Sequence, residues 1–499
     1  MKRTGIGRRG FVRHCCAGVL LAVGNVPALA QENPDIGQSS AKRGKRTVLE
    51  DMGAWVAAMR YEDMPATTVK KAKYLLLDTL GCALGAVNGK PVRVARDVIR
   101  ARGGSPQATV IGTRLQIACD EAAFLNAMQI RYLDFNDYAA FGYPHHPSIN
   151  LAPALAIAEM QNLSGRDLLL GLTVGYEVHI KLRDASERRG FDMPSIEAQY
   201  ASAACAARLL GLDAEGIANA IAIAASNANT LSEVRAGDEL TNAKGTAEAL
   251  AARSGTFAAL LSRGGLSYPL TIVDGEFSYG KLVSRGLKEE VLRQRSTDYE
   301  LMKSCMKMWP GIGTSQAPIA AALQLRERGI KADDIKSVKL HLSDFGYRQQ
   351  LGFLDHEIST REHADHSAPY LVARAFIDGD VRIEDFEERR YRDSRALAFI
   401  DKIKVVMDPA LTTNGGDVLG CSMEVLLDNG SVQKADMPYP PGSYQNPATD
   451  QQVQHKFVDL AEGVLGQAAT RRAMDTILSI DAKRDLKELI AALTPTRSM

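Results

Sequence analysis

The sequence has few cysteines, and their spacing fits neither a disulfide framework nor a metal site. Seven cysteines occur in 499 residues, and two of them, Cys15 and Cys16, fall in the first 30. The remaining five are an odd number, are widely spaced and form no CxxC pair, which argues against structural zinc, an iron–sulfur cluster and a disulfide scaffold. We expect these five to be buried small hydrophobic side chains: Cys82, Cys119, Cys205, Cys305 and Cys421.

The sequence also lacks an excess of charge of one sign and an apolar run long enough to span a membrane. It holds 60 Lys and Arg and 59 Asp and Glu. Five of the basic residues and none of the acidic ones lie at positions 1–30, so the rest of the chain is slightly acidic. This balance gives no indication of a nucleic-acid partner or of binding to an anionic membrane. No internal repeat is present, and the run Ala17–Val23 is too short for a stable anchor.

Residues 1–30 have the features of an export signal. Arg8-Arg9-Gly10-Phe11-Val12 resembles the twin-arginine pattern, an apolar run follows, and Ala28-Leu29-Ala30 is typical of a small-residue cleavage site. A disordered basic tail is the alternative. We predict a twin-arginine signal peptide at 1–30, handled by the twin-arginine export machinery, and a polar linker at 31–46. The mature chain would then be a soluble periplasmic or secreted protein.

The rest of the sequence predicts a mainly α protein with two domains, because 499 residues exceed one ordinary core. Helical periodicity dominates up to about residue 300 and returns near the C-terminus, whereas strand-like alternation and the hairpin signal Asp428-Asn429-Gly430 lie between. We therefore predict a large helical domain at 47–300, a smaller α+β lid domain at 301–440 inserted near the C-terminal end, and a return segment of the helical domain at 441–499.

Individual elements follow from the same patterns. Helices are expected at 64–87, 120–133, 147–161, 165–183, 196–210, 214–227, 243–263, 314–328, 366–378, 450–465 and 471–493. Strands are expected at 108–112, 335–342, 402–407 and 422–427.

Acidic, imidazole and aromatic groups are concentrated at 133–148, on a connection between two apolar helical segments. Asp134, Asp137, His145 and His146 fall within thirteen residues. Such groups on a connection between rigid elements suit a catalytic site. The alternative is that Asp134 caps a helix and the His-Pro pair begins the next one, since Asp, Asn and Pro are common in turns. Adjacent histidines diverge on most backbones, so we expect no metal bound by this pair.

Two lysines and one histidine complete the candidate residues. Lys244 stands at the start of a predicted helix, where its charge opposes the macrodipole. This misfit favours anion binding over the alternative of a solvated lysine. Lys307 lies close to Trp309 at the predicted domain junction, a frequent position for ligand sites. Among the histidines of the α+β region, which are otherwise expected on the surface or in the core, His366 with Asp365 is the best placed to approach the cleft.

Together these stretches resemble the MmgE/PrpD family, which includes 2-methylcitrate dehydratases, cis-aconitate decarboxylases and iminodisuccinate epimerases. The resemblance extends from about residue 48 to about residue 465. Its motifs are Leu76-Leu-Asp-Thr-Leu-Gly-Cys, Asn126 with Leu133-Asp-Phe-Asn-Asp, His146-Pro-Ser, Leu209-Leu-Gly-Leu, Lys244 with Ala252-Arg-Ser-Gly, Lys307-x-x-Pro310, and His366-Ser with Tyr370. The resemblance implies a mostly helical domain with an α+β lid, a homodimer, and a site between the two domains.

The resemblance also implies residue roles. Asp134 and His146 match the family's acid/base residues, Lys244 and Lys307 match cations that hold substrate carboxylates, and Tyr370 matches a tyrosine that reaches in from the lid. An ordinary imidazole titrates closest to neutrality, so His146 is the best candidate for the base. Asp134 is then expected either to orient His146 or to act as the partner acid if burial raises its pKa. Lys244 and Tyr370 complete the predicted catalytic set.

The chain departs from the family pattern at four positions. Tyr138 stands where cis-aconitate decarboxylases have threonine, while Asp192, Ala247 and Gln316 stand where many members have histidine. The missing imidazoles predict a less basic site, and therefore a substrate with fewer carboxylates or with an amino or hydroxyl group facing Asp192. Substrate contacts are expected from Lys307, Tyr138, Asp192, Asp137 and Gln316.

These features predict a cofactor-independent lyase of the dehydratase or decarboxylase type. It would act by proton transfer next to a carboxylate of a small hydroxy- or polycarboxylic acid. An epimerase or isomerase of a small dicarboxylate is one alternative, because it needs the same proton removal. A non-catalytic periplasmic carboxylate-binding protein is the other, although a binding protein needs the lysines and has no use for an acid/base pair.

Overall fold

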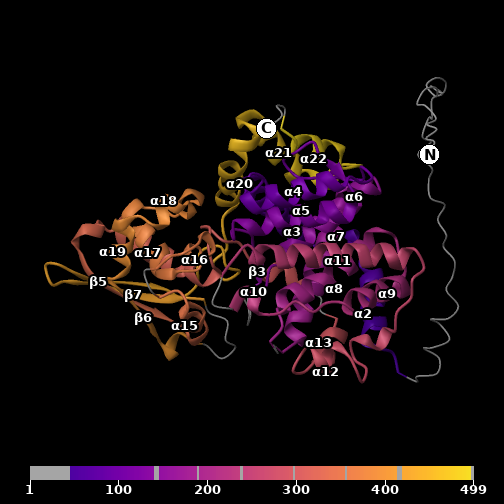
Figure 1. Cartoon of the computed structure of the whole chain (residues 1–499), viewed down its shortest axis with the longest axis horizontal. Coiled ribbons are helices and arrows are strands. Elements are labelled where there is room, and N and C mark those ends of the chain that lie inside the picture. The colour runs from indigo at the N-terminus through magenta and orange to yellow at the C-terminus, as the bar shows by residue number, and fades with distance from the viewer. Residues whose placement is uncertain are drawn as a thin grey trace, which may run out of the picture.

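The chain folds around two separate hydrophobic cores. The computed structural model describes residues 45–139, 145–187, 190–236, 240–295, 298–354, 357–412 and 419–495; the predicted signal peptide and all but the end of the predicted linker lie outside them. One core gathers side chains from 48–308 and again from 448–493, and the other takes residues from 309–437. Figure 1 shows the helical body and, beside it, the smaller orange unit that we call the lid. The predicted mainly α fold class with a smaller α+β unit is confirmed.

The helical body is built from long, largely buried helices. Its described helices are α2 (Val48–Ala58), α3 (Ala66–Gly85), α4 (Lys90–Arg102), α5 (Cys119–Tyr132), α6 (Leu151–Met160), α7 (Gly165–Ala185), α8 (Met193–Leu209), α9 (Ala214–Ala225), α10 (Glu233–Ala236), α11 (Ala243–Arg263), α12 (Tyr279–Leu282), α13 (Glu289–Arg293), α20 (Asp450–Leu465), α21 (Gln467–Leu478) and α22 (Lys487–Ala492). Small residues permit close packing: a Cβ on Gly255 of α11 would lie 2.4 Å from the backbone oxygen of Gln199 in α8. The C-terminal helices α20 and α21 lie against α3, near the start of the chain (Figure 1).

The lid is a four-stranded sheet with helices packed on it. Its strands are β5 (Ile335–Leu342), β6 (Ile403–Met407), β7 (Cys421–Leu427) and β8 (Val432–Met437), in the order β6-β5-β7-β8, with only β5 and β6 parallel. Its helices are α14 (Gln316–Glu327), α15 (Asp344–Gln350), α16 (Arg361–Ala364), α17 (Ala368–Asp378), α18 (Glu388–Tyr391) and α19 (Ser394–Ile400). Val338, Leu340 and Leu342 alternate inward along β5, as a half-buried strand requires.

A short antiparallel pairing joins the segment that contains Asp134 to the segment that contains Lys307. β3 (Tyr138–Ala139) pairs with β4 (Ser304–Cys305), so that Tyr138 lies opposite Cys305. The motif at 133–148 therefore lies beside the segment that carries Lys307, although the two are far apart in the sequence. A second short pair, β1 (Ala108–Thr109) and β2 (Gln116–Ile117), is all that forms at the predicted strand 108–112.

Two further sequence expectations are settled by the fold. The single helix expected at 471–493 is wrong: α21 ends at Leu478, a 3-10 turn follows at Ile480–Ala482, and α22 begins at Lys487. The five described cysteines are buried free thiols, as predicted. In the described ranges, no helix combines the length and the apolar character that a membrane crossing demands.

Candidate active site

A cavity open to solvent lies between the helical body and the lid, and the empty space there, open solvent included, is about 640 Å³. The helical body and the segment up to Lys307 contribute seven polar or charged side chains to its lining: Arg131, Asp134, Tyr138, His146, Arg235, Lys244 and Lys307. The lid contributes His366, Gln349 and Phe353 among others. The structure thus brings together four of the residues to which the resemblance gave roles, Asp134, His146, Lys244 and Lys307, and adds the predicted contact residue Tyr138.

Asp134 is the centre of an ion cluster. It follows the end of α5 in a left-handed conformation with φ 48°. Its carboxylate accepts hydrogen bonds from Lys244 Nζ (2.9 Å), Lys307 Nζ (2.8 Å) and Arg131 Nη1 (3.2 Å). Burial alone would raise the pKa of Asp134, but the two ammonium groups and Arg131 hold it well below the ordinary value. Asp134 is therefore ionised and binds cations, and the expectation that burial makes it a partner acid is wrong.

Lys244 connects the helical body to the lid. Its Nζ lies 3.2 Å from Oδ1 of Asp365 and 3.0 Å from Nδ1 of His366, in addition to its bond to Asp134. The side chain is buried, so the alternative of a solvated lysine is wrong. Asp134, Asp365 and His366 offer the residue types of a metal site, but the Lys244 ammonium already contacts all three.

Lys307 is held at the same cluster from the opposite segment. Its Nζ donates to both the backbone oxygen and Oδ1 of Asp134, each at 2.8 Å. Burial lowers the pKa of Lys307 to about 8, although Asp134 opposes this shift. Gln316 does not line the cavity. Its Oε1 accepts the N–H groups of Met308 and Trp309, at 2.9 and 3.2 Å, so it fixes the loop that follows Lys307.

His146 is oriented by Glu248, and not by Asp134 as the sequence had suggested. Nδ1 of His146 lies 2.9 Å from Oε1 of Glu248. Glu248 also binds Nε of Arg131 and lies 3.3 Å from Nη2 of Arg235. Burial and then the Arg131 charge lower the pKa of His146 to about 3, so the imidazole is neutral. Donation of the Nδ1 proton to the carboxylate leaves Nε2 as the proton acceptor.

Glu248 was missed in the sequence, and its spacing could have revealed it. It stands four residues after Lys244 on α11, which places the two side chains on one face of the helix. Burial alone would raise the pKa of Glu248, but Arg131 and Arg235 hold it well below the ordinary value. It is thus an ionised carboxylate with no exposure to solvent.

Asp192 lies behind the cavity rather than on its wall. Its Oδ1 accepts a hydrogen bond of 2.7 Å from Nε of Arg235, and Ser195 donates to its other oxygen. Arg235 does line the cavity. The expected contact between Asp192 and the substrate therefore does not hold, and the carboxylate instead positions an arginine that the sequence did not point to.

Two other predicted residues lie away from the described cavity wall. Asp137 is buried, accepts a 2.5 Å hydrogen bond from the Tyr176 hydroxyl, and has its pKa raised by burial to about 6. Tyr370, on α17, is packed in the lid core, and its hydroxyl donates to the backbone oxygen of Asp385. The resemblance implied that Tyr370 reaches into the cavity, but in this structure it does not.

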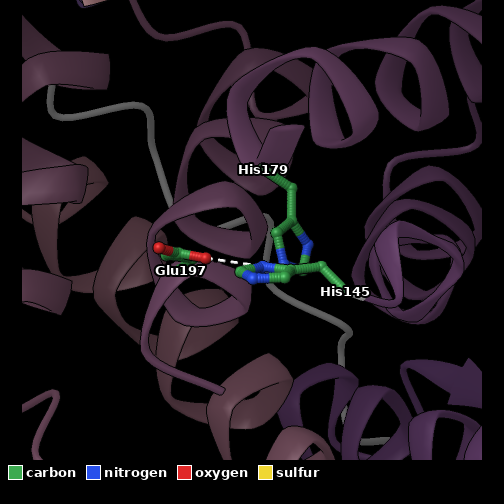
Figure 2. Close-up of side chains that lie close together, drawn as sticks. All are labelled: His145, His179 and Glu197. Atoms are coloured by element: carbon green, nitrogen blue, oxygen red, sulfur yellow. Dashed lines mark ion pairs between the residues drawn. The ribbon is translucent and has the colours of Figure 1, made fainter. Parts of the chain in front are cut away.

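His145 turns away from His146 into a buried cluster. Figure 2 shows its ring between the ring of His179 and the carboxylate of Glu197. Nδ1 of His145 lies 2.6 Å from Oε2 of Glu197, and the two histidine rings meet edge to face at 5.6 Å. These residue types can bind a metal, and one ligand atom of each lies within 4.8 Å of the others. A metal ion would first have to separate His145 and Glu197, whose Nδ1 and Oε2 atoms are in direct contact.

The fold and the cavity define a helical protein with a cavity lined by charged side chains beside an α+β lid. The model of the MmgE/PrpD N-terminal domain matches residues 50–291, and that of the MmgE/PrpD C-terminal domain matches residues 309–481. The chain belongs to the MmgE/PrpD family.

Several curated relatives align over most of the chain. A cis-aconitate decarboxylase-like protein, oryM, of Aspergillus oryzae is 24% identical over 475 residues, covering 90% of this chain and 97% of the relative. A 2-methylcitrate dehydratase of Salmonella typhimurium is 28% identical over 399 residues, 75% of this chain and 81% of the relative. The cis-aconitate decarboxylase of Mus musculus is 23% identical over 475 residues, 90% and 93% of the two chains.

Proposed function

We propose that the protein is a cofactor-independent lyase that eliminates water or carbon dioxide from a small hydroxy- or polycarboxylic acid. The observation that carries the proposal is the pair His146–Glu248 at a cavity lined by four cationic side chains. A neutral, oriented imidazole beside fixed cations is the arrangement needed to remove a proton from carbon next to a carboxylate. The names of the relatives, which are dehydratases and decarboxylases, support the same reaction class.

His146 acts as the base in this scheme. Nε2 accepts the proton while Nδ1 keeps its bond to Glu248, whose negative charge stabilises the imidazolium that forms. The pKa of about 3 belongs to the free protein, where burial and then the Arg131 charge disfavour the extra proton. An anionic substrate bound in the cavity adds negative charge beside the ring and raises that pKa toward the working range.

The cations hold the charge that develops on the substrate. Lys244, Lys307 and Arg235 face the cavity, and each can bind a carboxylate oxygen on which negative charge grows during proton removal. In dehydration the C–O bond then breaks, and the departing hydroxyl takes a proton from Lys307, whose lowered pKa suits it to this step. In decarboxylation the C–C bond to the carboxylate breaks and carbon dioxide leaves, the electron pair stays on the remaining carbon, and Lys307 donates its proton to that carbanion.

Arg235 changes the expected substrate. The sequence suggested a less basic site because Asp192 replaces an imidazole, but Asp192 holds Arg235, which itself lines the cavity. A guanidinium can bind a carboxylate through two parallel hydrogen bonds. We therefore propose a substrate with at least two carboxylates, and 2-methylcitrate and cis-aconitate are the first compounds to test.

Proton exchange in D2O, followed by NMR, tests the proposal. Wild-type protein, His146→Ala and a control, His455→Ala, whose histidine is exposed on α20, are incubated with 2-methylcitrate, cis-aconitate and a series of hydroxy- and aminodicarboxylates. We expect deuterium at the carbon next to a carboxylate, with alkene or carbon dioxide, in wild type and control only. Deuterium with inversion and no elimination would favour the epimerase. Binding with no exchange for any compound would favour the carboxylate-binding protein.

We further propose that the chain is exported through the twin-arginine machinery and acts as a periplasmic homodimer. Export is supported by Arg8-Arg9 and by the small residues that end at Ala30. Light scattering of the mature protein tests the dimer, and the mass of a monomer at micromolar concentration would contradict it.

A further inference from the structure

The return helix α20 reaches the site from the opposite end of the chain. It packs along α3, where Gly85 permits the close approach: a Cβ there would lie 2.9 Å from Cδ2 of Leu460. The approach directs Lys456 of α20 inward, and its side chain is only 7% exposed. A lysine this deeply buried needs partners for its charge.

The Lys456 ammonium has three acceptors from three segments of the chain. It lies 2.6 Å from Oδ1 of Asp78 on α3, and it donates to the backbone oxygens of Phe135 (2.7 Å) and Lys307 (2.9 Å). It also lies 3.8 Å from the centre of the Phe135 ring, in a cation–π contact. The buried ammonium therefore has one carboxylate beside it and donates to two backbone oxygens.

Both carbonyls belong to the segments that carry the site. Phe135 directly follows Asp134, and the second carbonyl is that of Lys307 itself. The Lys307 side chain returns to Asp134, so the two segments are joined on one side by the Asp134–Lys307 ion pair and on the other by Lys456. Asp134 has a left-handed backbone, which persists only where the surroundings hold it.

We infer that Lys456 is a positioning residue for the reaction proposed above, holding the Asp134 and Lys307 segments at the separation that proton transfer needs. The expected effect of Lys456 on the rate rests on the proposed function, whereas its expected effect on the structure rests on the contacts alone. Lys456 itself is not among the described residues that line the cavity, so it acts through the two backbones.

A purely structural role would give a different pattern of variants. If Lys456 only neutralises Asp78, the double variant Lys456→Met/Asp78→Asn regains both the thermal stability and the rate that Lys456→Met loses, because no buried charge is then left alone. If Lys456 positions the two segments, the double variant Lys456→Met/Asp78→Asn recovers thermal stability but not the rate, since both carbonyls still lack their donor. Lys181→Met is the control, because Lys181 is a buried lysine of α7 that donates to the Gln294 carbonyl away from the cavity.

The first measurement is turnover of whichever compound the wild type converts. We expect kcat to fall about 100-fold in Lys456→Met and in the double variant, as for a displacement of about 1 Å in a catalytic group, with KM changed less than kcat. Lys181→Met is expected to keep the wild-type kcat. A double variant that regains kcat together with its melting temperature would overturn the inference.

The second measurement needs no substrate. Hydrogen exchange followed by mass spectrometry is expected to show faster exchange at 134–139 and 305–312 in the double variant, with other regions unchanged. Unchanged exchange in these two segments would overturn the inference even if the rate fell. If the wild type converts no compound, the proposed function fails, while the exchange result still decides whether Lys456 holds the two segments.

Discussion

The Nδ1 atom of His146 lies 2.9 Å from Oε1 of Glu248, a residue 102 positions further along the chain. Glu248 is in turn bound to Arg131 and lies close to Arg235. The carboxylate thus sets the tautomer of the imidazole and links it to two guanidinium groups. This makes Glu248 the residue through which the ionic network of the cavity reaches the proposed base.

Glu248→Gln is expected to lower kcat by about 100-fold or more. The glutamine amide can donate to Nδ1 and so favour the tautomer that lacks a free acceptor at Nε2, as happens when a triad carboxylate is replaced by its amide. The measurement is kcat together with the melting temperature, because the variant also removes one of the two carboxylates that neutralise Arg131. Glu121→Gln, which alters a carboxylate bound to Arg102 and Arg253, is the control. A rate unchanged in Glu248→Gln would remove Glu248 from the mechanism.

The rate is expected to fall above about pH 8. Burial lowers the pKa of Lys307 to about 8, so its proton-donating form is present below that pH and lost above it. In kcat/KM, which reports the free enzyme, we expect a tenfold loss per pH unit on this limb. The arginine in Lys307→Arg keeps its charge at all these pH values, so the fall of kcat/KM above pH 8 should disappear in this variant, while kcat itself is lower. A limb that persists at pH 8 in Lys307→Arg belongs to another group.

The same shift predicts how stability depends on pH. The pKa of Lys307 is below its ordinary value of 10.5 in the folded chain, so the unfolded chain binds more protons between about pH 8 and 10.5. The contribution of Lys307 to the free energy of unfolding therefore rises with pH across this window. Between about pH 8 and 10.5, the free energy of unfolding measured with urea should rise less, or fall more steeply, in Lys307→Arg than in wild type.

Arg235→Met is expected to raise KM for a di- or tricarboxylate by about 10- to 100-fold, the range that corresponds to a charge-assisted hydrogen bond of roughly 1.5–3 kcal/mol. Asp192→Asn is expected to have a weaker effect in the same direction, because it leaves Arg235 in place but less firmly held. Arg253→Met, which removes an arginine bonded to Glu121 outside the cavity, is the control. If Asp192→Asn instead improved binding, the carboxylate would be repelling the substrate, as the sequence had first suggested.

Much of the fold could be predicted from local patterns. Helix 243–263, strand 335–342 and helix 450–465 occur with the predicted bounds, because periodicity and end signals agree there. The helix expected at 471–493 breaks for a reason that lies elsewhere in the chain. Gly165 donates its N–H to the carbonyl of Lys483, and Asp481 pairs with Lys73, so tertiary contacts replace the helical bonds.

The site could be predicted only where a motif carried it. Asp134, His146, Lys244 and Lys307 stand in motifs, and the fold brings them together. Arg131 and Arg235 acquire their roles from contacts with Glu248 on another helix, so no local pattern marked them, whereas Glu248 was marked only by its spacing of four residues from Lys244. The resemblance placed Tyr370 in a motif but could not give its direction, and helix α17 turns it into the lid core.

Tyr370→Phe is therefore expected to change stability and not chemistry. The hydroxyl donates to the Asp385 carbonyl inside the lid, and its removal should cost about 1 kcal/mol of unfolding free energy. We expect kcat to stay within about twofold of wild type, measured on the same substrate as the other variants. A loss of kcat without a change in melting temperature would mean that Tyr370 reaches the substrate in a closed lid.

Replacement of Arg8-Arg9 by two lysines tests the proposed export without changing the charge of the N-terminus. A twin-arginine signal depends on the guanidinium pair itself, whereas a basic tail depends only on charge. In a bacterial host with a periplasm we expect the Lys-Lys variant to remain uncleaved in the cytoplasm, while wild type and the control Arg13→Lys yield a periplasmic chain that begins near Gln31. N-terminal sequencing of the fractions gives the answer. Equal distribution of all three proteins would mean that residues 1–30 are not a twin-arginine signal, whatever the chemistry of the mature chain.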